Sequence, residues 1–325
     1  MKKIKVAING FGRIGRAFYK VASENKDIEI VAVNDLTSIE NVEYLLKYDT
    51  VYGKSDATLK GVKYVSEKDP TKLPWKELDV DVVVESTGLF TATEKAQAHI
   101  DAGAKRVVIS APIKDDVSPT VLMCMNEDKL KECKISSNAS CTTNAGSPLI
   151  AILDEAIGIE KALLNTVHAY TASQALVDGP SKKDMREGRA AAMNIVPSST
   201  GAAIAVGKVM PKFEGLFDGI SIRVPVAVGS IVDITFVAKK NTTAEEVNEI
   251  LKKAAGSDRW KGIFTVTEED LVSRDIVGNP HASIADLAFT RVVGGNLVKV
   301  LAWYDNEMGY TNTLVRHVIE AGKHI

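Results

Sequence analysis

The N-terminal segment constrains the fold more than any other part of the chain. An apolar run, predicted as a strand over Lys3–Asn9, leads directly into the pattern Gly10-x-Gly12-x-x-Gly15 and then into a helical pattern. Glycines at these positions allow, in turn, a tight turn, close approach of a pyrophosphate to the backbone, and close packing of helix on strand. Phosphates would lie at the helix N-terminus, where backbone N–H groups lack partners. The segment therefore predicts a dinucleotide-binding unit of the Rossmann type.

A second predicted strand, Ile28–Asn34, ends beside an acidic residue, Asp35, twenty residues after Gly15. A carboxylate at this position accepts hydrogen bonds from an adenosine ribose and repels a 2′-phosphate. We therefore expect the cofactor NAD to be favoured over NADP. A glycine pattern alone is weak, but strand, glycines, helix, strand and acid in one unit are more specific.

Strand and helix patterns continue to alternate over the first part of the chain. Such alternation is typical of an α/β protein with a doubly wound parallel sheet. The further strands are expected at Val80–Glu85, Arg106–Ser110 and Thr120–Cys124, and the helices at Gly12–Ser23, Ile39–Lys47 and Thr93–Ala102.

Beyond Cys141 the pattern changes to long alternating runs, expected as strands of a mixed or antiparallel sheet. They are Gly219–Val226, Ser230–Lys239 and Leu297–Tyr304, joined by a helix at Thr243–Ala254. We predict a nucleotide-binding domain over residues 1–140 and an α+β catalytic domain over 141–304. A last helix, Glu307–Gly322, has an apolar stripe that is expected to pack back on the first domain, so residues 305–325 are assigned to that domain.

Cys141 lies in a run of hydroxyl and amide side chains, Ser136–Asn144, at the expected start of a helix. The free N–H groups and the positive dipole end of a helix stabilise a thiolate, so we expect the pKa of Cys141 to fall below the usual value of about 8.5. A thiolate here would be a nucleophile. The alternative is a small buried side chain without chemistry, which is common for a lone cysteine.

His168 follows a predicted helix, Leu149–Ile157, and a predicted strand, Ala162–Val167. Together these two elements would return the end of the strand to the start of the helix. His168 would then be within reach of Cys141 for an ion pair or a proton relay. A structural histidine at a strand end is the alternative.

Motifs spread over the whole chain resemble those of the phosphorylating glyceraldehyde-3-phosphate dehydrogenase family. They are Ile8–Arg16, Asn34-Asp35, Leu46–Asp49, Glu85–Gly88, Ser136–Asn144, His168–Thr171, Pro197–Ala203, Arg223–Pro225 and Trp303–Glu307. The resemblance implies a glycolytic or gluconeogenic enzyme. It would convert D-glyceraldehyde 3-phosphate, NAD and inorganic phosphate into 1,3-bisphosphoglycerate and NADH.

The resemblance also implies a role for each matching residue. Cys141 would form a hemithioacetal and then a thioester, His168 would accept the hydroxyl proton, and the Cys141 N–H with the His168 ring would hold the oxyanion. The cofactor contacts would be Gly10, Phe11, Gly12, Arg13, Ile14, Gly15, Asp35, Ser110 and Asn306. Thr171 and Arg223 would bind the substrate phosphate, and Ser140, Thr142, Thr200 and Gly201 the attacking phosphate, with Arg223 near both. No metal site is expected.

Two of these residues have plausible alternative roles when taken singly. Arg223, before a strand proline, could be a surface salt-bridge partner. Asn306 could be the N-cap of the helix that begins at Glu307. By contrast, the run Ser199-Thr-Gly-Ala, at the start of a helix expected over Ala202–Val209, fits an anion-binding nest.

The chain departs from the family pattern at four positions. They are Ala145, where a second cysteine is usual, Ile204 in place of lysine, Val226 in place of threonine, and Met308 in place of tryptophan. Catalysis does not need the second thiol, but its absence makes a disulfide with Cys141 impossible, which would alter inactivation by oxidation.

The stretch Tyr170–Asn194 is polar and too long for an ordinary connection. It includes Lys182, Lys183, Arg186 and Arg189. It could be a solvated surface loop. The resemblance instead assigns it to a loop that lines the neighbouring subunit's cofactor site, and thereby implies a homotetramer.

The composition limits the remaining possibilities. A chain of 325 residues with 45% hydrophobic residues suffices for two cores. The net charge of −2 shows no footprint for nucleic acid. Three cysteines, Cys124, Cys133 and Cys141, form no disulfide framework, and no apolar run approaches a membrane span. We expect a reduced, cytoplasmic enzyme without a signal peptide, a membrane partner or a nucleic-acid partner.

Three alternatives stay open. Erythrose-4-phosphate dehydrogenase is a related enzyme in which water releases the acid, but the intact Ser199-Thr-Gly-Ala run argues against it. A non-enzymatic NAD-binding scaffold would not need Cys141, His168 and Arg223 together. A secondary role in RNA binding lacks a basic stripe.

Overall fold

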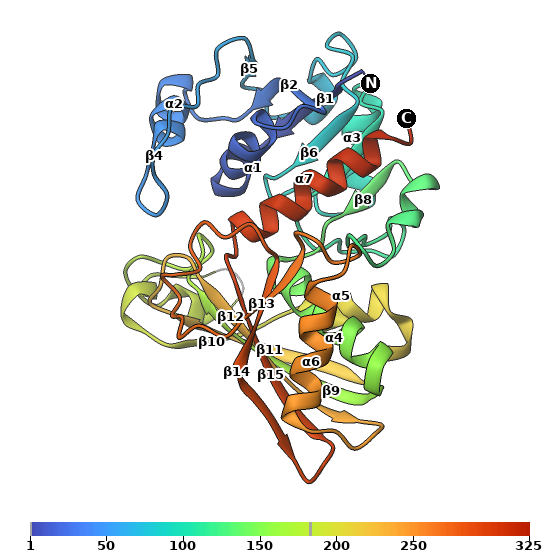
Figure 1. The fold of residues 1–325 in the computed structure, drawn as a ribbon. Coiled ribbons are helices and arrows are strands. Elements are labelled where there is room, and N and C mark those ends of the chain that lie inside the picture. The colour runs from blue at the N-terminus through green and yellow to red at the C-terminus, as the bar shows by residue number, and fades with distance from the viewer. Residues whose placement is uncertain (1, 182–183) are drawn as a thin grey trace. The chain divides into compact units, whose positions relative to one another are not determined.

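A computed structural model describes residues 2–181 and 184–325. The chain forms two compact units (Figure 1). One contains the residues up to Ser140 together with Thr311–Ile325, and the other contains Cys141–Tyr310. Lys182 and Lys183, which belong to the long polar stretch, lie outside the described residues.

A six-stranded parallel sheet forms the centre of the first unit, as the alternating pattern predicts. Its spatial order is β5 (Lys63–Val65), β2 (Ile28–Asn34), β1 (Ile4–Asn9), β6 (Val82–Glu85), β7 (Arg106–Ile109) and β8 (Ile135–Ser137). Every neighbouring pair runs parallel. The order reverses direction between β1 and β6, and sheets of this kind bind ligands beyond the carboxyl ends of the strands at that switch point.

Helices cover both faces of this sheet. The helices are α1 (Arg13–Ser23), α2 (Ile39–Lys47), α3 (Thr93–Asp101) and α7 (Met308–Gly322). Ala96 of α3 packs in a core cluster with Ile135, whereas His317 of α7 contacts the next residue, Ser136. Successive side chains of a strand point to opposite faces. The doubly wound fold and the return of the C-terminal helix to this unit are therefore confirmed.

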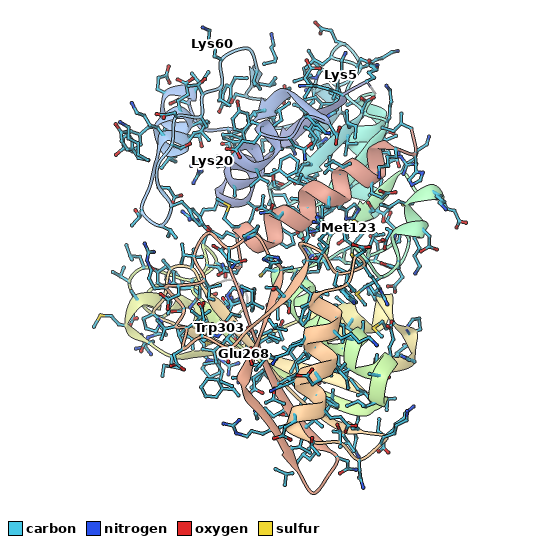
Figure 2. All side chains as sticks on the ribbon, viewed as in Figure 1. Lys5, Lys20, Lys60, Met123, Glu268 and Trp303 are labelled. Atoms are coloured by element: carbon cyan, nitrogen blue, oxygen red, sulfur yellow. The ribbon has the colours of Figure 1, made fainter. Side chains whose placement is uncertain are left out.

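The strand predicted over Thr120–Cys124 is wrong. Only Thr120 forms an isolated bridge, with Ser137. The chain then turns at Met123, labelled in Figure 2, and Cys124 has a φ of 70°. The Asn126 side chain closes this turn, because its Nδ2 atom donates to the Thr120 carbonyl and its Oδ1 atom accepts the Leu122 backbone N–H. The apolar residues are buried in a turn, so burial alone produced the strand-like pattern.

Short elements complete the first unit. A two-stranded ribbon pairs β3 (Tyr48–Asp49) with β4 (Gly53–Lys54). Two 3-10 turns lie at Pro70–Lys72 and Glu127–Lys131.

The second unit contains a seven-stranded mixed sheet. Its order is β10 (Val196–Ser199), β11 (Phe217–Val224), β9 (Ile159–Ala169), β12 (Ser230–Ala238), β15 (Leu297–Tyr304), β14 (Ser283–Val293) and β13 (Phe264–Thr267). The β11–β9 and β13–β14 pairs are parallel and the others antiparallel. The predicted mixed sheet is confirmed.

Helices α4 (Cys141–Ile157), α5 (Ala202–Val209) and α6 (Ala244–Ala255) pack against this sheet. Further 3-10 turns lie at Met185–Gly188, Ala191–Met193 and Pro211–Phe213. Along β12 every second residue is buried, which is the pattern of a strand with one covered face. Among the described residues, no helix is both long and apolar enough to cross a membrane.

Candidate active site

The glycine turn of the first unit has the geometry that each glycine demands. Gly10 has a φ of +92°, and a Cβ there would lie 2.7 Å from the backbone nitrogen of Thr87. A Cβ on Gly15 would lie 2.2 Å from the Gly10 carbonyl oxygen, so helix α1 can approach the turn only without a side chain. Gly12, by contrast, has open space around the position that a Cβ would take, and it precedes α1 without a side-chain cap. An open helix N-terminus of this kind suits a pyrophosphate.

Asp35 lies next to this turn, at the end of β2. Its Oδ2 atom accepts the Phe11 backbone N–H at 2.7 Å, and its Oδ1 atom accepts the Thr37 N–H at 2.9 Å. Each carboxylate oxygen keeps a second lone pair. Asp35 thus joins the end of β2 to the glycine turn and can still accept a ribose hydroxyl.

The other predicted contacts of the first unit surround the same strand ends. Arg13, on the first turn of α1, forms an ion pair with Asp49 at 3.1 Å. Ile14 is half-buried on that helix. Ser110 follows β7, and its N–H donates to the Glu85 carbonyl at 2.9 Å. These residues fit a NAD site, because open backbone donors and an acid lie at the switch point of the sheet.

In the second unit, Cys141 is the first residue of α4 and His168 lies near the end of β9. The Sγ atom of Cys141 is 3.3 Å from Nε2 of His168. His168 is buried, and Cys141 is half-buried. The return of the chain from α4 through β9 therefore brings the two side chains together, at a distance suited to proton transfer.

The charge state of this pair differs from the expectation of a thiolate. Burial raises the pKa of the Cys141 thiol, although the Arg223 charge and the hydrogen bonds at the helix start oppose this. Burial, together with the Arg223 charge, lowers the pKa of His168 to about 3. Desolvation disfavours both charged forms. Both pKa shifts thus favour a neutral thiol and a neutral imidazole over the expected thiolate–imidazolium pair.

Arg223 of β11 is a cation that lies beside this pair. β11 and β9 pair in register, with Arg223 opposite His168. An Nη atom of Arg223 contacts Nδ1 of His168 at 2.5 Å and the Ala169 carbonyl at 3.3 Å. Within the described chain, Arg223 Nε and Gln174 Nε2 are buried donors without an acceptor. This environment differs from that of a surface salt bridge and leaves a buried donor available to an anion.

The remaining predicted anion contacts occupy two places. Thr171 follows β9, and its hydroxyl bonds Ser173. Thr200 accepts the Ala202 N–H at the start of α5, and Gly201 has open space where a Cβ would be. The β10–β11 register pairs Ser199 with Ile220, three residues from Arg223, which corresponds to about 10 Å along a strand.

Thr142 and Ser140 flank the nucleophile. Ser140 is half-buried directly before Cys141. The Thr142 hydroxyl is buried and bonds the Tyr304 hydroxyl at 2.9 Å, which in turn bonds Thr166 at 2.8 Å. The Tyr304 ring packs edge-on against His168. Sequence reasoning missed Tyr304 in this role, although it lies within the Trp303–Glu307 motif.

Asn306 does not cap the last helix. Its carboxamide oxygen accepts the Gly229 N–H at 3.1 Å and the Ser230 hydroxyl at 3.2 Å. The start of α7 is supported by Asp305, whose Oδ1 atom accepts the backbone N–H groups of Glu307 and Met308. The N-cap alternative is therefore excluded. The two hydrogen bonds to the carboxamide oxygen fix the orientation of the Asn306 side chain, including its NH2 group.

The four departures from the family pattern lie in different environments. Ala145 is fully buried one turn after Cys141, and Ile204 is 62% exposed on α5. Val226 forms backbone hydrogen bonds to Val224 and Tyr170. Met308 is half-buried at the first position of α7.

Together, a Rossmann-type sheet with an open glycine turn and a second unit with a cysteine–histidine pair beside a half-buried arginine define the class of NAD-dependent aldehyde-oxidising enzymes that use a thiol. Comparison with known families narrows this class. Residues 4–93 match the family described as glyceraldehyde 3-phosphate dehydrogenase, NAD binding domain, and residues 140–306 match its C-terminal domain. The chain belongs to the glyceraldehyde-3-phosphate dehydrogenase family.

Individual relatives resemble the chain along almost its whole length. It is 48% identical to the glyceraldehyde-3-phosphate dehydrogenase of Mycobacterium avium, over 98% of this chain and 99% of the relative. It is 45% identical to glyceraldehyde-3-phosphate dehydrogenase B of Aspergillus oryzae, over 98% and 99%. The Borreliella burgdorferi enzyme is 46% identical over 96% and 98%. The predicted family, the NAD cofactor and the oxidoreductase activity are thereby confirmed.

Proposed function

We propose that Cys141 and His168 catalyse the phosphorylating oxidation of D-glyceraldehyde 3-phosphate in this chain. The observation that carries the proposal is the 3.3 Å approach of Cys141 Sγ to His168 Nε2 at the start of α4. A thiol beside a neutral imidazole can lose its proton to that ring as it attacks. The sulfur then bonds the aldehyde carbon, and the proton passes to the aldehyde oxygen to give a hemithioacetal.

His168 acts again in the oxidation step. Its Nε2 atom accepts the hydroxyl proton of the hemithioacetal, which leaves a thioester on Cys141. NAD, when bound, supplies the two-electron acceptor. The Cys141 backbone N–H, at the helix start, is suited to hold the oxyanion, and the packing of Tyr304 against the imidazole fixes the ring. Phosphate oxygen finally bonds the acyl carbon, and the sulfur leaves as thiolate and regains its proton.

Two separate anion contacts support inorganic phosphate, and not water, as the acyl acceptor. Arg223 and Thr171 are assigned to the substrate phosphate. Thr200 and Gly201, with Ser140 and Thr142, are assigned to the attacking phosphate. The N-terminus of α5 offers backbone donors beside Gly201, where no side chain blocks an anion. An erythrose-4-phosphate dehydrogenase would not need this second contact.

NAD binding is assigned to the first unit, through the turn of Gly10, Phe11, Gly12, Arg13, Ile14 and Gly15 with Asp35 and Ser110. Asn306 is assigned to the nicotinamide carboxamide. Residues 1–140 with 305–325 would then form the nucleotide-binding domain, and residues 141–304 the catalytic domain.

NADH formation with glyceraldehyde 3-phosphate, measured with and without inorganic phosphate, tests this function. Sustained turnover only with phosphate supports it. Sustained turnover without phosphate would indicate release by water, and no NADH under either condition would indicate a scaffold.

A homotetramer in the cytoplasm is the assembly that we further propose. Five large apolar side chains along the stretch that follows β9 are 71% to 89% exposed; they are Leu176, Val177, Met185, Met193 and Ile195. Large exposed apolar surface of this kind marks a protein contact. Sedimentation of the purified chain tests the proposal, and a monomer would contradict it.

A further inference from the structure

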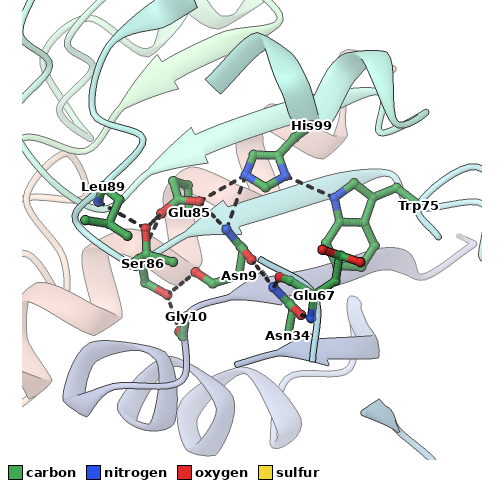
Figure 3. A network of polar contacts seen from close by, with 10 residues as sticks. Asn9, Gly10, Asn34, Glu67, Trp75, Glu85, Ser86, Leu89 and His99 are labelled. Carbon is green, nitrogen blue, oxygen red and sulfur yellow. Dashed lines mark hydrogen bonds and ion pairs between the residues drawn. The ribbon is translucent and has the colours of Figure 1, made fainter. Parts of the chain in front are cut away.

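A chain of buried polar side chains lies next to the Gly10 turn, in the first unit (Figure 3). It links Trp75, His99, Glu85, Asn9 and Asn34, each of which is at most 5% exposed. Buried polar groups are costly unless every one has a partner. None of these five side chains has a role in the chemistry described above, so their presence at the switch point of the sheet requires another explanation.

The hydrogen bond from Trp75 fixes the tautomer of the His99 ring. The indole N–H of Trp75 contacts His99 Nδ1 at 3.1 Å. An indole nitrogen can only donate, so His99 Nδ1 must accept. The ring therefore has its proton on Nε2, which lies 3.0 Å from Glu85 Oε2 and donates to it. Trp75 thus orients His99 as a donor toward Glu85.

Glu85 accepts hydrogen bonds from three segments, which are α3, β1 and the residues that follow β6. Its Oε2 atom accepts from His99 and from Asn9 Nδ2, the latter at 2.6 Å. Its Oε1 atom accepts the Thr87 backbone N–H at 2.8 Å and the Thr87 hydroxyl at 2.5 Å. Each of these four groups can donate a hydrogen to the carboxylate, so both oxygens of Glu85 have hydrogen-bond partners.

Two of these segments, the end of β1 and the residues after β6, lie on the two sides of the Gly10 turn. Asn9 directly precedes Gly10, and a Cβ on Gly10 would lie within 2.8 Å of Ser86 and Thr87. The Ser86 hydroxyl also donates to the Gly10 carbonyl at 2.7 Å. A change in the position of the Glu85 carboxylate would therefore move the turn from both sides.

The same chain of hydrogen bonds continues to the strand end that carries Asp35. Asn9 Oδ1 accepts from Asn34 Nδ2 at 2.7 Å, and Asn34 is held on both sides by the Glu67 backbone. Asp35 follows directly and accepts the Phe11 N–H. One hydrogen-bonded chain thus connects the ends of β1, β2 and β6.

We propose that Glu85 and His99 are positioning residues for the cofactor: they hold the glycine turn and the Asp35 carboxylate in the arrangement that binds the pyrophosphate and ribose of NAD. This inference rests on the NAD site proposed above. It concerns the affinity for NAD and not the chemistry at Cys141. A lost hydrogen bond to a buried charge weakens a site by about tenfold.

Titration of the whole chain with NAD, with the heat of binding measured by calorimetry, gives the Kd for NAD and tests the proposal. His99→Leu removes the donor to Glu85 and the acceptor for Trp75, and we expect the Kd for NAD to rise by about tenfold. His99→Gln offers one donor and one acceptor, so we expect it to restore most of the affinity. With NAD saturating, kcat and the KM for aldehyde should stay near those of the parent chain in both variants.

Val107→Ala is the matched control, because Val107 is a buried core residue of β7 whose side chain makes none of these hydrogen bonds. It should lower the melting temperature without changing the Kd for NAD. If His99→Leu does not fold, Trp75→Phe decides the matter, because it keeps an aromatic ring and removes only the donor to His99. For Trp75→Phe we expect the Kd to rise about threefold.

The outcomes separate the two claims. A parent chain that does not bind NAD would overturn the proposed cofactor site itself. A parent chain that binds NAD, with an unchanged Kd in His99→Leu, or in Trp75→Phe where that variant decides, would overturn only the positioning role. So would an equal loss of affinity in His99→Leu, His99→Gln and Val107→Ala, since that would be a general effect of lower stability.

Discussion

The imidazole of His168 lies between the thiol of Cys141 and the guanidinium of Arg223. Its Nε2 atom is 3.3 Å from Cys141 Sγ, and its Nδ1 atom is 2.5 Å from an Nη atom of Arg223 and 2.6 Å from the Ala169 carbonyl. Donation from Arg223 to Nδ1 and donation from Nδ1 to Ala169 need different tautomers. Only the second leaves Nε2 free to accept the thiol proton. We therefore expect Arg223 to release Nδ1 before His168 acts as a base, in line with the proposed contact of Arg223 with a phosphate.

The pH dependence of Cys141 alkylation follows from the neutral thiol–imidazole pair. Because burial raises the pKa of the Cys141 thiol, the rate with iodoacetamide should keep rising with pH above neutrality instead of levelling off below it. His168→Asn removes the base and should slow the reaction at neutral pH. A chain with Cys124→Ser and Cys133→Ser, which leaves one thiol, is the suitable background. A rate independent of pH from neutrality upward would show a thiolate already formed.

Cofactor choice should depend on Asp35. The carboxylate that accepts the Phe11 N–H also faces the expected ribose, so kcat/KM with NAD should exceed that with NADP by at least about tenfold, or roughly 1.4 kcal/mol. Asp35→Gly should narrow the gap. Asp35→Asn serves as a control, since it keeps an acceptor for Phe11 and removes the charge. Equal use of both cofactors by the parent chain would contradict the assignment.

The two anion contacts should separate in steady-state kinetics. Thr200→Ala should mainly raise the KM for inorganic phosphate, whereas Arg223→Gly should impair the steady-state kinetics with both the aldehyde and inorganic phosphate. Each lost contact should cost about 1–3 kcal/mol of transition-state binding. Val226→Thr, which adds a hydroxyl, should change only the phosphate dependence, and modestly. A higher KM for aldehyde in Thr200→Ala, with the phosphate KM unchanged, would reverse the two assignments.

Acid should destabilise the fold through His317. This side chain is buried between Ser136 and Asn138, and burial lowers its pKa to about 3. The unfolded chain takes up a proton near pH 6.5, but the folded chain does not. The contribution of His317 to the free energy of unfolding is therefore at its full value above about pH 6.5. It falls toward pH 3 by about 1.4 kcal/mol for each pH unit. Urea unfolding of His317→Asn against pH should show a shallower slope than the parent chain. An identical slope would exclude His317 as a source of the loss.

The sequence predicted those parts of the fold that local patterns determine. The bounds of β2, α2 and β15 follow from runs of apolar residues, and the geometry of Gly10 and Gly15 follows from steric need. Strand β14 was missed because it carries charges such as Asp286, which is buried and accepts hydrogen bonds from the Trp303 indole of β15 and the Ala288 backbone. The hydrogen bonds that link Trp75 to His99 and His99 to Glu85 could not be predicted either, because these residues lie far apart along the chain. Such partners are defined by the packed sheet and not by spacing along the chain.

The candidate site shows the same division. Cys141 and His168 were identified because a helix start and a strand end carry a local signature. The neutral state of the pair was not predicted, since it depends on burial within the second unit and on the charge of Arg223. The role of Tyr304 depends on hydroxyl groups from α4 and β9 that meet only in the folded sheet.

The central claim is that Cys141 carries the acyl group. Rapid mixing of the chain with NAD and glyceraldehyde 3-phosphate, in the absence of inorganic phosphate, tests it most directly when NADH is followed and the quenched protein is examined by mass spectrometry. We predict a rapid burst of NADH, an acyl adduct on the peptide that contains Cys141, and release of that adduct when phosphate is added. Cys141→Ser should bind NAD and give neither burst nor adduct. A burst in Cys141→Ser, or an adduct on another residue of the parent chain, would contradict this claim.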